Sequence, residues 1–184
     1  MPISTINQNG LNAPLSLTAP NLGTPSAINL SNATALPKAA LPAGSVLQVV
    51  SFSTSTPFST TSGTPTATPI TQNITPTSAS SKILTIVSST LGIPVTGMNG
   101  LVNLYRNGAN LVSNSYPMYM SYGAAQYLSF GFCLSYLDSP ATTSSTTYAV
   151  YAWRDGAAGT IYVGARYDGF SQITSTITLM EIAA

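Results

Sequence analysis

Short runs of β-branched and aromatic residues, separated by turn residues, restrict the fold of this chain more than any other feature of its sequence. In one run, large side chains occupy the even positions from Leu128 to Tyr136, whereas the odd positions up to Ser135 carry small ones. This period of two predicts a strand with a bulky face on a core and a small opposite face. The strand-like segments are 45–52, 82–89, 101–106, 110–113, 126–137, 146–154, 160–167 and 175–182.

Turn sequences separate these segments, and no segment shows sustained helical periodicity. Asn107-Gly108 tolerates the positive φ angles of a type I′ turn and predicts a hairpin. Asp155-Gly156, followed by Gly159, predicts a second one. About eight antiparallel strands in this arrangement predict an all-β fold, an antiparallel sandwich of the jelly-roll type.

A proline-rich stretch precedes the strand-like region. Proline at this density excludes a helix or a central strand and predicts extended chain. We therefore divide the sequence into an extended N-terminal arm, 1–43, and a β-sandwich knob, 44–184. Single apolar residues recur along the arm, which favours docking on other copies or on a partner protein over a disordered linker. The candidate docking residues are Leu11, Leu15, Leu17, Leu22, Ile28 and Leu30.

The chain carries very little charge: charged residues make up 5% of it and the net charge is +1. Without a basic patch we expect no nucleic-acid binding, and without mutual repulsion copies can associate easily. We therefore expect copies of the chain to associate, with a monomeric sandwich and a free tail as the alternative. The stretch from Tyr119 to Leu137 is long enough to span a membrane, but polar residues interrupt it and its second half alternates as a strand does, so no membrane insertion is expected.

Catalytic chemistry has few candidate residues. Histidine is absent, which excludes imidazole-activated nucleophiles and imidazole metal sites. A glycosidase-type pair could come only from four carboxylates, for which turn or strand roles suffice. We predict no enzymatic activity, no metal site and no cofactor. The four residues are Asp138, Asp155, Asp168 and Glu181.

The single cysteine, Cys133, lies inside the alternating strand 126–137. It has no partner in the chain for a disulfide. Free cysteine is among the most buried residue types, so we predict a buried, small apolar residue rather than a reactive thiol.

Three tyrosines precede that strand in the segment "SYPMYMSYG" (115–123). Pro117 and Gly123 punctuate it, and the tyrosine spacing matches no strand period. We predict an exposed or interface loop with Tyr116, Tyr119 and Tyr122 as candidate receptor-binding residues. Tyrosine rings offer flat apolar area at low entropy cost, and the alternative for each is burial against another subunit.

The phrases "LPAGSVLQVVSFST", "ITPTSASSKILTIVSS", "LYRNG", "SPATTSSTTYAVYAWRDG" and "STITLMEIAA" occur in this order, preceded by the linker-like "AINLSNATALPKAALPAG". Together they resemble the C-terminal knob of tail-fibre and related virion proteins of tailed bacteriophages, over residues 28–184. The resemblance implies a trimeric structural module that is made in the host cytoplasm, is displayed on the virion and docks to other virion proteins of the tail, baseplate or capsid.

The function that follows from the resemblance is attachment to a host surface glycan or protein. The arm is short for a long fibre. We therefore keep as the alternative a head decoration or cement protein that binds the capsid through this arm. The start of the sequence, "MPISTINQNG", shows no secretory signal.

Overall fold

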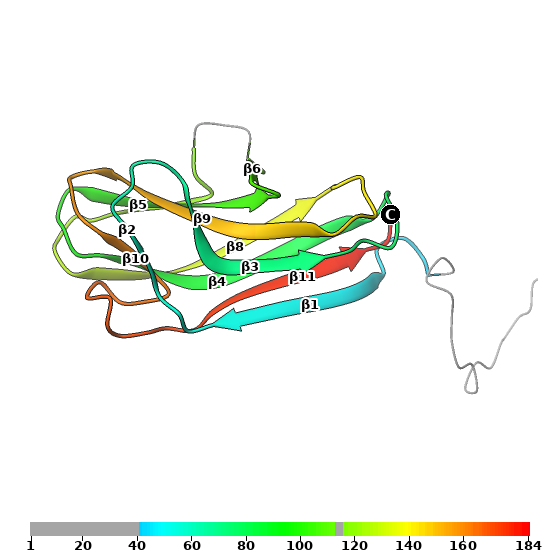
Figure 1. Ribbon diagram of the computed structural model, residues 1–184, viewed down its shortest axis with the longest axis horizontal. Helices are drawn as coiled ribbons and strands as arrows, with labels where there is room; N and C mark the ends of the chain where they lie inside the picture. The colour runs from blue at the N-terminus through cyan, green and yellow to red at the C-terminus, as the bar shows by residue number, and fades with distance from the viewer. Residues whose placement is uncertain (1–40, 113–115) are drawn as a thin grey trace, which may run out of the picture. The chain divides into compact units, whose positions relative to one another are not determined.

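The computed structural model describes residues 41–112 and 116–184. In these residues all regular structure is β: eleven strands form two antiparallel sheets, and no helix is present (Figure 1). The all-β prediction is confirmed. No segment of the described residues is therefore a helix that could cross a membrane.

Sheet A is ordered β1-β11-β4, and β8 pairs with the other edge of β4. Two short strands, β10 and β2, extend the sheet beyond the start of β11. The strands are β1 (Val46–Thr54), β2 (Phe58–Thr60), β4 (Lys82–Ile93), β8 (Leu128–Asp138), β10 (Ile161–Val163) and β11 (Ser175–Ile182).

Sheet B is ordered β3-β9-β5, and both β6 and β7 pair with the remaining edge of β5. The strands are β3 (Thr66–Ile74), β5 (Met98–Arg106), β6 (Ala109–Asn110), β7 (Tyr119–Tyr122) and β9 (Thr146–Gly156).

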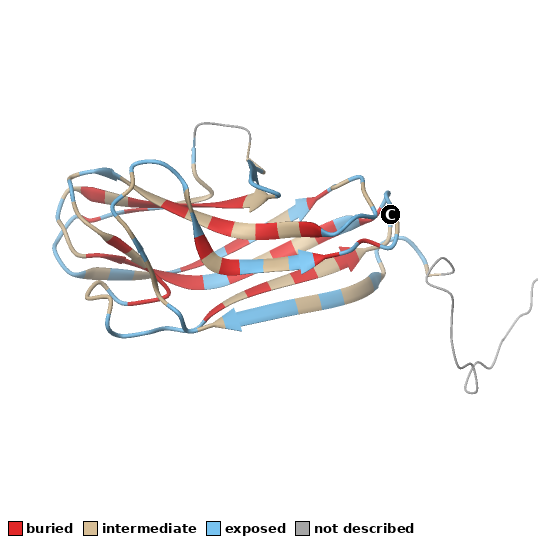
Figure 2. Cartoon of the chain, viewed as in Figure 1, coloured by how far each residue is buried: buried red, intermediate tan, exposed pale blue. Residues whose placement is uncertain are grey.

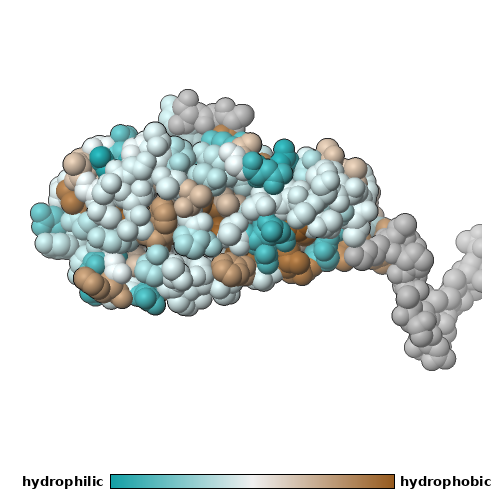
Figure 3. Space-filling model, in the orientation of Figure 1, coloured by the Kyte–Doolittle hydropathy of each residue, from teal (hydrophilic) through white to brown (hydrophobic). Residues whose placement is uncertain are grey.

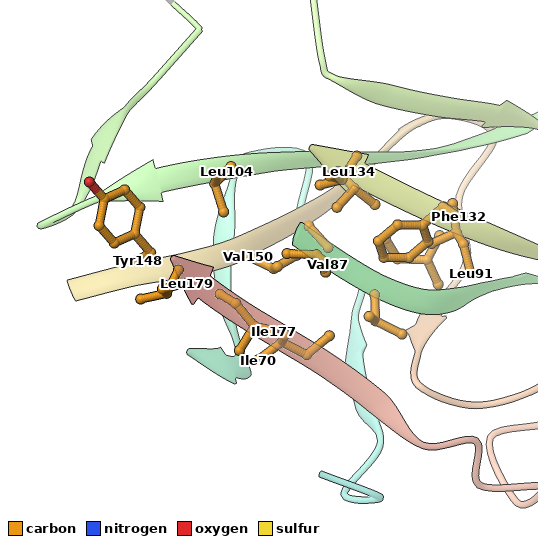
Figure 4. Close-up of a cluster of buried hydrophobic side chains, with 14 of the residues drawn as sticks. Ile70, Val87, Leu91, Leu104, Phe132, Leu134, Tyr148, Val150, Ile177 and Leu179 are labelled. Atoms are coloured by element: carbon orange, nitrogen blue, oxygen red, sulfur yellow. The ribbon is translucent and has the colours of Figure 1, made fainter. Parts of the chain in front are cut away.

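The core lies between the two sheets and is made of alternate residues of their long strands (Figures 2 and 4). On β8 the even positions face this core: Phe132 and Leu134 are buried between exposed neighbours, as the period of two predicts. On β9 the buried positions are also even, and they include Tyr148 and Val150. Each fully buried large side chain stabilises the fold by about 1.5–3 kcal/mol.

Three strands, β2, β3 and β7, fall outside the predicted segments. β3 contains Pro69, which cannot donate to a ladder hydrogen bond. The structure tolerates it because β3 is an edge strand of sheet B, and its register with β9 shifts between Ala67 and Thr71. Proline is therefore a weaker argument against a strand at such a position than in the middle of a sheet.

The two hairpin predictions have different outcomes. Asn107 and Gly108 have φ angles of 49° and 79° and connect β5 directly to β6, so this prediction is confirmed. The hairpin predicted at Asp155-Gly156 is wrong. β9 belongs to sheet B, whereas β10 pairs with β4 and β2 of sheet A, so this loop crosses between the sheets.

The chain enters and leaves the knob at the same end. The Gly44 amide donates to the Ala183 carbonyl at 2.8 Å, and the Ala183 amide donates to the Ser45 carbonyl at 2.9 Å. We call this the terminal end. The opposite end, the free end, carries the loops 94–97, 123–127, 157–160 and 164–174 (Figure 1).

A charged hydrogen-bonded group ties the sheets together near the terminal end. Arg106 of β5 donates through Nη1 to both carboxylate oxygens of Asp138 on β8, at 2.9 and 2.8 Å. The Tyr148 hydroxyl of β9 donates to Oδ2 of Asp138 at 2.6 Å. Burial raises the pKa of Tyr148, and the bond to Asp138 raises it further, so Tyr148 keeps its proton. Asp138 of sheet A is thus held by two side chains of sheet B.

Candidate binding surface on the outer face of sheet B

Aromatic side chains gather on the face of sheet B that points away from the core. Because even positions of β9 are buried, Tyr151 and Trp153 point outward. The register places Leu101 between Trp153 and Met120, and Asn99 between Asp155 and Tyr122. Residues opposite each other in a ladder lie side by side on one face. We call this surface, Tyr105, Met120, Tyr122, Tyr151 and Trp153, the aromatic face.

The rings on this face are held close together. Tyr105 and Tyr151 stack with ring centroids 3.9 Å apart and planes at 21°. Trp153 follows Tyr151 by two residues, which places it about 7 Å further along the same face. Burial raises the pKa of Tyr105, and the neighbouring Tyr151 raises it further, so its hydroxyl is neutral around pH 7. The result is a strip of uncharged, partly exposed rings.

Amide side chains accompany the rings, and charge is scarce. Asn103 is buried beside the strip: its Nδ2 donates to Asn110 at 3.1 Å, and its Oδ1 accepts from the Met118 amide at 2.7 Å. These bonds fix the chain that leads into β7. Asp155 is the one charged side chain among the outward positions of β5, β7 and β9. The face can therefore offer apolar stacking and hydrogen bonds with little net charge.

The structure separates the three tyrosines of the predicted loop. Residues 119–122 form β7 rather than a loop, because pairing with β5 overrides the turn residues that flank them. Tyr119 points inward, with its ring centroid 5.4 Å from that of Phe132. Tyr122 is 57% exposed and joins the aromatic face, whereas Tyr116 is 76% exposed and precedes β7. Of the three candidates, only Tyr122 lies beside Trp153 and its neighbours.

A second aromatic group lies at the free end. The rings of Tyr127 and Tyr167 have centroids 5.2 Å apart, and the Arg166 guanidinium lies 4.9 Å from the centre of the Tyr167 ring. Asp168 pairs with Arg166 and accepts hydrogen bonds from the Phe170 and Ser171 amides. This confirms its turn role.

The same turn keeps Asp168 and Arg166 charged and places Phe170 at the tip of the hairpin 165–172. The hydrogen bond with Arg166 lowers the pKa of Asp168 and raises that of Arg166. The Phe170 ring at the tip is 88% exposed.

The buried carboxylates serve the fold. Ile83 of β4 pairs with Asp138 of β8 on one side and with Glu181 of β11 on the other, and both carboxylates face the core. Glu181 accepts from the Thr77 amide and hydroxyl at 2.7 and 2.8 Å, and from Gln48 at 2.7 Å. Burial alone would raise the pKa of Glu181, but these hydrogen bonds outweigh it and the pKa lies below its ordinary value. Within residues 41–112 and 116–184, no three His, Cys, Asp or Glu side chains come together as a metal site.

The prediction for Cys133 is wrong. The residue is exposed, because it occupies an odd position of β8 and the odd positions face away from the core. Its preference for burial as a residue type was a weaker guide than the alternation of its own strand. The arm candidates Leu11, Leu15, Leu17, Leu22, Ile28 and Leu30 lie outside the described residues.

The sequence did not reveal the aromatic face, although it predicted the strand 146–154 that carries Tyr151 and Trp153. Segment 146–154 carries large residues on both sets of alternate positions, so its period of two does not reveal which set faces the core. No protein-family model matches the chain, and no curated protein matches it.

Proposed function

We propose that this chain is a structural protein of a bacteriophage virion and that its knob attaches the particle to a polysaccharide of the host surface through the aromatic face. The proposal includes a homotrimeric knob of the jelly-roll type, displayed on the particle. The order of phrases in the sequence supports the virion origin. The observation that carries the attachment role is the strip of uncharged rings around Trp153.

Sugar rings have apolar faces edged by hydroxyl groups. Aromatic side chains provide flat apolar area for such faces and lose little conformational entropy when they bind. The amide of Asn99 and the carboxylate of Asp155 lie in the row next to Trp153, within the same surface, and can bond hydroxyl groups. A surface of this composition suits a neutral polysaccharide better than a phosphate-rich polymer, which would need clustered cations.

The position of the face fits display. The chain enters the knob at the terminal end, beside Ala183, so the outer faces of the two sheets are not obstructed by the entry point (Figure 1). The core and the Asp138 group hold the sheet behind the aromatic face rigidly. Rigid rings on a packed sheet bind without first being ordered.

The chain has one tryptophan, Trp153, and it lies on the aromatic face, so its fluorescence reports on this site. We expect saturable changes in emission when the full chain is titrated with polysaccharides purified from bacterial envelopes. Tyr122→Ser should weaken the response about 10-fold or more, because one stacking ring is lost. Tyr127→Ser, which removes an exposed ring at the free end, is the matched control and should titrate like the wild type.

If no polysaccharide changes the Trp153 emission but labelled cells still bind the protein, the receptor is a protein and not a glycan. Localisation tests the virion role separately. Gold-labelled antibodies against the knob should mark the tail of intact particles. Labelling over the head would instead support the decoration protein and refute attachment through a tail knob.

A further inference from the structure

We infer that the outer face of sheet A, over the half nearer the terminal end, is the surface through which copies of this chain associate. This rests on the self-association in the proposed function and names its contact face. A row of apolar side chains crosses all four long strands here: Val49 on β1, Met180 on β11, Leu84 on β4 and Leu137 on β8. We call this the aliphatic row. Hydrophobic surface gathers along β1 and β11 in Figure 3.

The aliphatic row is open at both of its ends. Val49 is 53% exposed and Leu137 is 51% exposed, one on each edge of the sheet. The next rows toward the free end hold Ile86 and Cys133 among serine and threonine residues. Lys82, at the margin, is the one charged residue on the outward positions of these four strands. A face of this kind needs no oppositely charged partner, so a second copy can cover it.

Gly131, one row beyond Cys133 toward the free end, gives an independent reason to expect close contact at the margin of this face. It lies in the middle of β8 with a negative φ angle, and the β4–β8 register runs past it without a shift. A Cβ atom added there would meet nothing within 4 Å. The fold of one copy therefore does not require glycine at this position. Glycine inside a regular strand often marks a place where another backbone approaches closely.

The limits of the face follow from the hairpin 165–172. An added Cβ at Gly92, on the outward side of β4, would lie 2.7 Å from the Tyr167 nitrogen, so this hairpin covers the sheet there. The Tyr167 amide also donates to Ser129 of β8 at 3.1 Å. The hairpin thus shields the part of sheet A nearer the free end and leaves the aliphatic row uncovered.

The flat area of this face can be compared with what a stable contact needs. Four strands spaced by about 4.8 Å, each contributing about seven residues of 3.3 Å, give a flat area of roughly 440 Å² per copy. Two such faces cover roughly 900 Å² before side-chain relief is counted, which is below the ~1,200–2,000 Å² of specific interfaces, so a stable contact also needs area from the margins of the face.

The edges of the sheet add to this contact. β1 carries neither charge nor proline to protect its free edge, and Figure 2 shows it as the most exposed of the long strands. Burial of this edge against a second copy would remove an aggregation-prone surface. It would also extend the interface beyond the flat face.

Analytical ultracentrifugation of the full chain tests the inference. We expect an oligomer for the wild type and association weakened by about 100-fold for Leu84→Lys, because a lysine would be buried without a partner. Gly131→Val should retain its melting temperature and also associate more weakly. Phe170→Lys, which introduces the same charge on an exposed residue at the free end, should associate like the wild type.

Cys133 provides a measurement that needs no folded variant. In the wild-type chain its reaction with maleimide should be fast in dilute solution and should slow as the oligomer forms. A monomeric wild type, an unchanged mass for a folded Leu84→Lys, or a labelling rate independent of concentration would overturn the inference. A dimer that depends on Leu84 would support the proposed contact face and would refute only the trimer. The Trp153 titration would still test attachment separately.

Discussion

The two sheets bury similar inner faces but expose different outer ones. Sheet B presents stacked and neighbouring rings, from Tyr105 to Trp153, with amide groups beside them. Sheet A presents the aliphatic row from Val49 to Leu137, followed by hydroxyl groups, and no aromatic ring lies in that row.

The difference follows from what each side-chain type does best. A continuous row of aliphatic side chains suits a permanent contact between copies, because the interfaces of homodimers are more apolar than the rest of a protein surface. Flat rings with polar edges suit reversible binding of a ligand. In our two proposals, one fold with hardly any charge separates assembly from recognition by the kind of apolar side chain on each face.

The two outer faces belong to one packed knob, and Asp138 adds a buried charged contact between its sheets to the hydrophobic core. Asp138→Ala would leave Arg106 and Tyr148 without their common acceptor. We expect a loss of about 3 kcal/mol in the free energy of unfolding. This is the lower end of the range for breaking a buried ion pair, because the Arg106 side chain is partly exposed. Urea denaturation measures it.

The control is Asp168→Ala, which removes an exposed ion pair at the free end and should leave the urea midpoint almost unchanged. Equal losses in the two variants would show that the Asp138 group does not hold the sheets together. In that case the hydrophobic core alone would hold the two sheets together.

Two glycines test the difference in packing between the inner face of sheet B and the outer face of sheet A. A Cβ atom at Gly100, on the inner face of sheet B, would lie 2.6 Å from Cδ2 of Leu91. Gly100→Ala should therefore cost about 1–3 kcal/mol of stability through overpacking. Gly131→Ala, on the outer face of sheet A, should cost nothing in a single copy and can gain from β propensity. Thermal unfolding of dilute protein compares them, and an unstable Gly131→Ala would contradict the open face.

The smallest expected effect is a loss of folding stability in acid, and it comes from Glu181 on the inner face of sheet A. Because the pKa of Glu181 in the folded chain lies below its ordinary 4.5, its contribution to stability is complete above pH 4.5 and is lost as the pH falls through the folded value. Glu181→Gln should flatten the loss of stability below pH 4.5, measured as the urea midpoint from pH 7 to pH 3. Asp155→Asn is the exposed control, and an equal flattening there would remove Glu181 as the cause.

Periodicity and turn chemistry predicted much of this fold. The alternation in 126–137 correctly assigned the two faces of β8, and Asn107-Gly108 correctly located a tight hairpin. Both predictions rest on local properties of the backbone.

Features that depend on pairing between distant strands could not be predicted in this way. The aliphatic row exists only because four strands align in register, and its members are 49, 84, 137 and 180. Tyr119 shows the same limit, because only the pairing of β7 with β5 turns its ring toward Phe132. Sequence identifies a strand, but its neighbours decide what each of its faces contacts.

The pairing of β1 with β11 has a consequence for how the chain reaches its folded state. Gln48 bonds Glu181 across a separation of 133 residues. At typical synthesis rates of about 5–20 residues per second, β1 waits roughly 7–27 s for its partner strand to leave the ribosome. During that time the uncharged segment "VLQVVSFST" has no place in a sheet, and non-local pairing of this kind also slows folding after release. We therefore expect nascent chains to be most prone to associate with one another before the eleventh strand arrives.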